Sequence, residues 1–417
     1  MKDPAENLEV YLVGGSVRDQ LLELEIQDRD WVVIGATPAQ MIERGFKPVG
    51  EEFPVFLHPL SGEEYALARS ERKTSKGYRG FDVISDPNIT LTQDLQRRDL
   101  TINAIAMDAQ GNLIDPFGGV RDAQQRILKH VSPAFSEDPV RILRVARFAA
   151  RFESMGFSVN PETLDLMKQM VAMGEVDALQ PERIWKELHG ALCESGTSRF
   201  IEELRRCGAL EKILPEVDAL FGIPQPLEYH PEVDTGVHVM MALDAAHRLS
   251  ENPRVIFAVL VHDLGKALTP EKALPAHRGH EHSGLRLVEQ LCTRLRIPGK
   301  YRRLALRVCE YHLHHHRMLV LKPTTVLTLL EQLDAFRQPD NVRLFSLCCI
   351  ADLRGRSGME DLDCPQSKLL GRYHTAALSV NAAAIAERCR EGGKIKKELR
   401  RQRVAAIAVI KREQTYR

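Results

Sequence analysis

The sequence predicts an α+β protein, with a small mixed sheet and flanking helices first and a long helical region after it. Short β-rich runs separated by turn signals occur up to about Gly119, for example at 65–68 and 113–116. From Pro139 onward the pattern is almost wholly helical, and prolines such as Pro181 mark helix boundaries. The 417 residues and 44% apolar composition suffice for two or three domains with buried cores.

Charge and cysteine usage narrow the class of protein. The 57 basic and 57 acidic residues give a formal net charge of zero, so any nucleic-acid contact must come from local patches. The eight cysteines lack a C-x-x-C spacing, which indicates a reducing compartment, and we expect a cytoplasmic protein. No apolar run approaches the roughly 18 residues needed to cross a bilayer, so no membrane contact is expected.

The first candidate site lies between Tyr11 and Ile34. Asp28-x-Asp30 is predicted to open an apolar strand, and because side chains alternate along a strand both carboxylates would share one face. Such a pair suits Mg²⁺, a hard cation that prefers oxygen ligands. Taken alone, an Asp-x-Asp is more often a solvated turn or strand edge, so its surroundings decide between the two interpretations.

The turn before this pair predicts an anion-binding pocket. An apolar strand ends at Gly14 and Gly15, whose backbone N–H groups can approach a phosphate. A helix from Ser16 to Leu22 is expected behind the turn, with Arg18 one turn into it and facing the same phosphates.

The chain resembles the class II tRNA nucleotidyltransferases in segments that occur in this order: YLVGGSVRDQLLE, DRDWVV, EEYALAR, RRDLTINAIA and EDPVRILRVARFAAR. The resemblance covers essentially the whole chain and is to the long form of the bacterial CCA-adding enzymes, which carries an HD phosphohydrolase domain. It implies template-independent addition of CCA to the 3′ end of tRNA from CTP and ATP, with Mg²⁺.

The same resemblance implies four parts. They are a polymerase-β-like nucleotidyltransferase head at 1–138, a helical neck and body at 139–224 with the nucleotide-recognition helix and an RNA-binding region, an HD domain at 225–355 and a C-terminal helical tail at 356–417. Monomer and homodimer both remain open.

Several site residues of the head follow from the resemblance. Glu64 is expected to be a third carboxylate, although an exposed glutamate at a strand edge is an equally good interpretation. The segment Glu71 to Phe81 resembles the flexible loop that helps such enzymes change from adding C to adding A. The residues expected to bind phosphates and sugar are Gly15, Arg18, Arg98, Arg144 and Arg147.

Asp138 and Arg141 are expected to read the base. Residues three apart on a helix share a face, so a carboxylate acceptor and a guanidinium donor can lie side by side. Cytosine and adenine present an amino donor beside a ring-nitrogen acceptor, which this pair complements. Uracil and guanine present a carbonyl beside a ring N–H, so the pair would select C and A without a template.

A second constellation consists of His238, the His262-Asp263 doublet and Asp352. Followed by Leu-Gly-Lys, the doublet resembles the HD domain, in which a bridging carboxylate and imidazoles from several helices hold a divalent metal. The metal is expected to be a transition metal, with Ni²⁺ and Mn²⁺ as candidates. The implied activities are 2′,3′-cyclic phosphodiesterase, 2′-nucleotidase and phosphatase.

Further histidines are candidates for a second metal. His280 and His312 are expected to bind it, whereas the neighbours at 314–316 cannot all face one ion. A basic stretch at 394–403 either contacts tRNA or is a solvated helix face. Two other functions compete: a bacterial poly(A) polymerase, which would usually have a longer basic tail and no intact HD set, and a metal-dependent phosphohydrolase whose head only binds tRNA.

Overall fold

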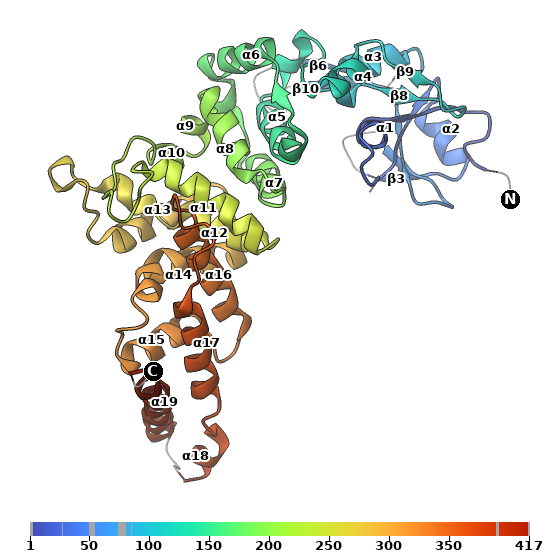
Figure 1. Cartoon of the computed structure of the whole chain (residues 1–417). Helices are drawn as coiled ribbons and strands as arrows, with labels where there is room; N and C mark the ends of the chain where they lie inside the picture. Colours follow the sequence, from blue (N-terminus) through green and yellow to red (C-terminus); the bar gives the residue numbers. More distant parts are fainter. Residues whose placement is uncertain are drawn as a thin grey trace. The chain divides into compact units, whose positions relative to one another are not determined.

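The computed structural model describes residues 3–26, 28–49, 55–73, 81–84, 86–388 and 392–415. The chain divides into two compact units, Met1–Ile213 and Leu214–Arg417. The named strands all fall in the first unit, which also carries helices, and the second is built from helices (Figure 1). The α+β class is therefore confirmed, while the predicted division into four parts stays a prediction.

A seven-stranded mixed sheet opens the first unit, with the strand order β3-β4-β5-β2-β1-β8-β9. Its strands are β1 (Glu9–Val13), β2 (Asp30–Ile34), β3 (Lys47–Val49), β4 (Val55–Leu57), β5 (Glu64–Leu67), β8 (Ala106–Met107) and β9 (Leu113–Ile114). The helices among them are α1 (Gly15–Leu21), α2 (Pro38–Glu43), α3 (Leu91–Gln96) and α4 (Gly119–Gln124), with a 3-10 turn η2 (Thr101–Asn103).

The register of β2 positions the polar residues at one end of the sheet. β2 pairs antiparallel with β1, so that Val13 lies opposite Asp30, and parallel with β5, so that Asp30 lies opposite Glu64. The chain leaves β1 directly after Val13 and begins α1 at Gly15. The carboxylates of Asp30 and Glu64 and the Gly14 turn therefore meet at the same edge.

Apolar side chains alternate across β2 and pack on both faces of the sheet. Val32 packs in a cluster with Val13 and Leu95 of α3, whereas Val33 packs with Met41 of α2 and Phe56. This alternation is the period of two expected of a strand that is covered on both sides. Asp30 lies on the same face as Val32, toward α3 and η2.

A run of helices completes the first unit and continues away from the sheet (Figure 1). It consists of α5 (Val140–Arg151), α6 (Pro161–Ala172), α7 (Pro181–Leu192), α8 (Thr197–Arg206) and α9 (Ala209–Ile213). α5 is the central helix because it packs against both α7 and α8. Its buried side includes Ile142, Val145 and Phe148, which follow helical spacing.

The second unit is a helical array. Its helices are α10 (Pro215–Asp218), α11 (Thr235–Leu249), α12 (Pro253–Val261), α13 (His280–Arg294), α14 (Gly299–His316), α15 (Pro323–Gln332), α16 (Asp340–Arg354), α17 (Pro365–Leu378), α18 (Ala382–Arg388) and α19 (Gly392–Thr415). α12 is buried along its length from Val255 to Val261 and contacts α11, α14 and α16. Among the described residues, no helix combines the length and apolarity needed to span a bilayer.

Two sequence predictions need correction. The strand expected to open at Asp28 begins at Asp30, because β1 turns into α1 after Val13 and offers no partner to earlier residues. The segment Glu71 to Phe81, expected to be a loop, has strand at both of its ends, because 71–73 belong to β6 (Ser70–Lys73) and Phe81 begins the paired strand β7 (Phe81–Ile84). Its central residues 74–80 lie outside the described residues.

Candidate functional site

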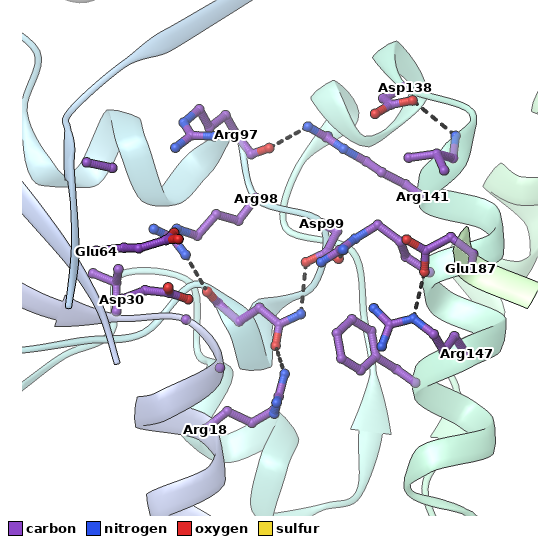
Figure 2. A pocket seen from close by; sticks show the side chains of 18 of the residues that line it. Arg18, Asp30, Glu64, Arg97, Arg98, Asp99, Asp138, Arg141, Arg147 and Glu187 are labelled. Carbon is purple, nitrogen blue, oxygen red and sulfur yellow. Dashed lines mark hydrogen bonds and ion pairs between the residues drawn. The ribbon is translucent and has the colours of Figure 1, made fainter. Parts of the chain in front are cut away.

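A cavity of about 600 Å³ lies in the first unit, between the end of the sheet and α5 (Figure 2). Basic side chains outnumber acidic ones on its walls, so it suits an anion. The basic residues are Arg18, Arg69, Arg97, Arg98, Arg141, Arg144, Arg147, Arg151, Arg183 and Lys186; the acidic ones are Asp30, Glu64, Asp99, Asp138 and Glu187.

The acidic edge of the cavity is formed by neighbouring strands. Asp30 and Glu64, paired in register, line both this cavity and an adjoining one of about 500 Å³, and Asp28 lines only the second. Removal from water raises the pKa of the Asp30 carboxyl, Arg98 opposes this rise and Asp28 adds to it. The three carboxylates thus gather where a cation would relieve their repulsion.

Arg98 crosses the Gly14 turn from the opposite wall. A Cβ atom on Gly14 would lie 2.8 Å from a guanidinium nitrogen of Arg98, so a side chain at this position would displace the guanidinium. The φ angle of Gly14 is 70°, which also favours glycine. Arg98 in addition pairs with the fully buried Asp94 at 3.1 Å. Arg98, which the sequence predicts to bind phosphate, is therefore held at the glycine turn.

Arg18 is a buried part of the wall, only 3% exposed. Its guanidinium donates to Asp19 at 2.8 Å and to the Asn103 side chain at 2.6 Å, and it lies over the Phe148 ring. Burial lowers the pKa of Arg18, which the charge of Asp19 counteracts. Gly15 and Arg18 both line the cavity as predicted, with Arg18 already engaged on one side by protein acceptors.

The predicted base-reading pair lines the cavity, but its members are held by different partners. Asp138 precedes α5 instead of lying on it, and both of its carboxylate oxygens accept hydrogen bonds from Arg183, at 3.0 and 2.6 Å. The buried Arg141 donates to the backbone carbonyls of Ala134 and Arg97, at 2.7 and 2.6 Å. The prediction of one shared helix face is wrong, because α5 begins at Val140, two residues after Asp138.

The α5 arginines are likewise anchored by acids. Arg144 donates to Asp99 at 2.7 Å and Arg147 to Glu187 at 2.6 Å. Burial raises the pKa of Asp99, but the charge of Arg144 and hydrogen bonds to the carboxylate outweigh burial and hold that pKa well below its usual range. Both arginines therefore line the cavity with fixed orientations, and Figure 2 shows Arg147 beside Glu187.

Sequence reasoning missed Arg183 and Glu187, both on α7. They are four residues apart, so they lie on one helix face and reach Asp138 and Arg147 respectively. The Arg-x-x-x-Glu spacing was a visible signal, but a helix with such a pair is usually a solvated one. Only the packing of α7 against α5 turns the pair toward the cavity.

The second constellation forms a buried cluster inside the second unit. His238 Nε2 lies 3.2 Å from Asp352 Oδ1, and His262 Nε2 lies 3.2 Å from Asp263 Oδ2. The other two distances between an imidazole nitrogen and a carboxylate oxygen in this group of four are 4.0 Å, from His238 to Asp263, and 3.8 Å, from His262 to Asp352. Such spacings leave room for one metal ion between the four atoms. The doublet lies at the end of α12, not within a helix, since α12 ends at Val261.

The other oxygen of Asp263 meets the predicted second set. Asp263 Oδ1 lies 3.2 Å from His280 Nε2 and 3.7 Å from His312 Nε2, and the two imidazole nitrogens are 3.2 Å apart. The structure therefore brings His280 and His312 together, with Asp263 between the two groups. Burial lowers the pKa of His312 to about 3, so its imidazole is neutral and able to bind a metal.

The histidines at the end of α14 point in different directions, because neighbouring residues of a helix lie on different faces. His316, four residues after His312, contacts Asp352 Oδ2 at 2.6 Å, while His315 contacts Ser367 on another side. His316 was not predicted, although its spacing from His312 gave the signal.

Two observations test whether a metal suits this cluster. His262 Nε2 and Asp263 Oδ1 are buried without a hydrogen-bond partner, although such atoms are normally satisfied. Burial raises the pKa of Asp263, but His262 and Lys266 outweigh it and keep that pKa well below its ordinary value. Charged carboxylates and imidazole nitrogens with unsatisfied atoms in a buried site fit a divalent cation.

Three protein-family models match the chain. The model described as "Poly A polymerase head domain" matches residues 10–129. The model described as "Probable RNA and SrmB- binding site of polymerase A" matches residues 156–221. The model described as "HD domain" matches residues 235–351, a range that contains His238, His262 and Asp263 and ends one residue before Asp352.

Curated relatives match almost from end to end. A protein of Thioalkalivibrio sulfidiphilus named "Multifunctional CCA protein" is 54% identical over 97% of this chain and 99% of its own length. A protein of the same name from Teredinibacter turnerae is 53% identical over 98% of this chain and 99% of its own length.

Solved structures share the fold at lower identity. A CCA-adding enzyme in complex with CTP has a TM-score of 0.65 at 21% identity, covering 97% of this chain and 89% of that one. The Thermotoga maritima CCA-adding enzyme complexed with tRNA has a TM-score of 0.63 at 20% identity, covering 99% and 92%.

Gly14→Ala should weaken anion binding in the cavity in addition to lowering the stability of the protein. The strained φ should cost about 1–3 kcal/mol of unfolding free energy, and the added methyl group should displace Arg98. We expect weaker pyrophosphate binding by isothermal titration calorimetry.

Gly111→Ala is the matched control, because Gly111 also has a positive φ but open space around its Cβ position. It should lose stability without losing pyrophosphate affinity. Equal losses of affinity in both variants would contradict the role assigned to the Gly14–Arg98 contact.

Proposed function

The chain belongs to the family of multifunctional CCA proteins, and from this premise we propose that it adds CCA to the 3′ end of tRNA, using CTP and ATP. The observation that carries the proposal is the cavity in which an acidic strand edge faces an arginine-rich wall. Relatives at 54% identity over the full length and a neighbour in complex with CTP support it.

The cavity has the parts that nucleotidyl transfer needs. The terminal 3′-oxygen of the tRNA attacks the α-phosphorus of CTP or ATP, a P–O bond forms to that oxygen, and the bond to pyrophosphate breaks. The hydroxyl proton leaves to solvent. Arg98 at the Gly14 turn, with Arg144 and Arg147 on α5, would hold the phosphates and sugar and balance the charge on the departing pyrophosphate.

The acidic edge would hold Mg²⁺. Asp28 and Asp30, with Glu64 beside them, are oxygen ligands of the kind that this cation prefers. When bound, Mg²⁺ would lower the pKa of the 3′-hydroxyl and stabilise charge on the leaving group.

Base selection is proposed for Asp138 and Arg141. Arg183 holds the Asp138 carboxylate, and two carbonyls hold the Arg141 guanidinium, so neither side chain can rotate freely to suit a different base. A rigid acceptor and a rigid donor favour the edges of C and A over those of U and G. Side chains that reoriented at low cost would accept all four bases.

For the second unit we propose metal-dependent hydrolysis of 2′,3′-cyclic phosphates, 2′-nucleotides and other phosphomonoesters. One ion would be held by His238, His262, Asp263 and Asp352, and a second by Asp263, His280 and His312. Such ions supply a nucleophilic hydroxide and polarise the phosphoryl oxygens when bound. Repair of damaged tRNA ends would then precede CCA addition.

The first test is the product length on tRNA that lacks its 3′ end, with Mg²⁺ and each of the four nucleoside triphosphates singly and together. We expect ordered growth by C, C and then A, after which extension stops, read on a sequencing gel. A long tail of A residues would instead establish a poly(A) polymerase.

Asp28→Ala is the matching loss-of-function variant in that assay. It should lower incorporation at least about 100-fold, because a lost metal ligand removes several kcal/mol of transition-state stabilisation. Binding of tRNA, measured by filter retention, should persist. Substantial residual incorporation would refute the metal assignment.

Asp138→Asn should relax base selection. The amide has the size of the carboxylate but adds a donor that can face the carbonyl of uracil. Discrimination between CTP and UTP should fall by about 10- to 100-fold, measured as the ratio of kcat/KM values. Asp165→Asn, on the exposed side of α6, is the control; unchanged rejection of UTP by Asp138→Asn would exclude the base-reading role.

His262→Ala should separate the two activities. Hydrolysis of 2′,3′-cyclic AMP should be lost, because a buried ligand is removed, while CCA addition continues at the wild-type rate. A parallel loss of both activities would mean that His262 is needed for folding rather than for hydrolysis.

A further inference from the structure

Four histidines of the buried cluster, His238, His262, His280 and His312, each direct Nε2 toward the cluster and Nδ1 away from it. They differ in the group that forms a hydrogen bond with Nδ1. Nδ1 lies 2.7 Å from the Val259 carbonyl in His262, 2.7 Å from the His277 carbonyl in His280, and 3.0 Å from the Cys309 carbonyl in His312. A carbonyl can only accept, so in these three rings Nδ1 carries the proton and Nε2 is left for the centre.

His238 has a charged partner instead. Its Nδ1 lies 3.0 Å from Glu232 Oε1, besides 3.2 Å from the Gly355 carbonyl. Its Nε2 lies 3.2 Å from Asp352 Oδ1, on the side of the centre. The nearest comparable carboxylate is Glu281, whose oxygen lies 3.8 Å from Nδ1 of His280, beyond hydrogen-bond distance.

We propose that Glu232 is a positioning residue of the first metal site. It accepts the Nδ1–H of His238, which fixes the ring so that Nε2 is the free ligand atom. Its negative charge makes His238 a more basic and stronger ligand. The inference rests on the proposed metal-dependent function of this unit.

Glu232 is itself held rigidly, as this role requires. Its side chain is only 2% exposed although it lies in the segment before α11. The same oxygen Oε1 also lies 2.9 Å from His230 Nδ1, and Oε2 accepts the backbone N–H of Ser357 at 3.4 Å. A surface glutamate would point to water instead.

The alternative role for Glu232 is direct metal binding with His230 and His238, whose potential ligand atoms lie within 4.8 Å of one another. The Gly355 carbonyl argues against it. This acceptor lies 3.2 Å from His238 Nδ1, which favours a proton on that nitrogen and leaves it no lone pair for an ion. The two contacts of 2.9 and 3.0 Å to one oxygen are hydrogen-bond distances.

The test uses Co²⁺ as the probe and the full chain. Asp28→Ala and Asp30→Ala are included so that the proposed Mg²⁺ ligands of the first unit do not contribute. Affinity and stoichiometry are read by visible absorption during Co²⁺ titration. Glu232→Gln keeps the size and an accepting oxygen but removes the charge; Glu228→Gln, an exposed glutamate of the same segment, is the control.

We expect Glu232→Gln to weaken one of two bound Co²⁺ ions by about 10- to 100-fold, with Glu228→Gln unchanged. In a chain with intact Asp28 and Asp30, Glu232→Gln should still add CCA normally. Its hydrolysis of 2′,3′-cyclic AMP should be impaired at low Co²⁺ and recover at saturating Co²⁺, which damage to the fold would not allow.

Three results would overturn the inference. Wild-type Co²⁺ affinity in Glu232→Gln would remove the positioning role. A third ion that is lost with Glu232 would make this residue a ligand. A parent chain that binds no Co²⁺ at all would overturn the proposed metal centre itself, and is distinguishable because it appears before any change at Glu232.

Discussion

The pairing of β2 between β1 and β5 is the constraint on which the cavity of the first unit depends. The antiparallel partner ends at Val13, opposite Asp30, and the parallel partner begins at Glu64, also opposite Asp30. One register therefore brings the two carboxylates and the Gly14 turn to the same edge. A shift by one residue would send Asp30 to the other face of the sheet, toward Met41.

The basic wall opposite this edge is maintained by buried acids. Asp94 holds Arg97 and Arg98, and Asp99 holds Arg144. Glu187 holds Arg147, and Asp19 holds Arg151. Removing one partner of such a buried pair typically costs about 3–5 kcal/mol, since it leaves a charge uncompensated. A chain of zero net charge can thus present a cationic cavity, because basic residues outnumber acidic ones on its walls and two of the acids, Asp19 and Asp94, do not line it.

The buried cluster of the second unit is assembled from several helices, unlike the acidic edge of the first unit, which one strand register sets. Its candidate ligands come from α11, the end of α12, the start of α13, α14 and α16, so no local segment could form it alone. Close approach of backbones makes this convergence possible: a Cβ on Gly265 would lie 2.0 Å from the His280 carbonyl.

The three arginines of the basic stretch on α19 are partly used for packing, since Arg400 contacts Glu331, Arg401 pairs with Glu398, and Arg403 lies over Phe336.

The sequence by itself determined the α+β class, the glycine turn, the acidic strand edge and the candidate ligands His238, His262, Asp263 and Asp352, because these depend on local spacing and motif order. The tertiary structure alone decided what each side chain faces. Asp28 lies outside β2 because β1 ends, and Arg183 reaches Asp138 from 45 residues away. The contacts of Glu232 with His238 and of His316 with Asp352 form only where α11, α14 and α16 meet. Periodicity along a chain specifies which face a residue occupies, whereas the partner across that face is set by long-range packing.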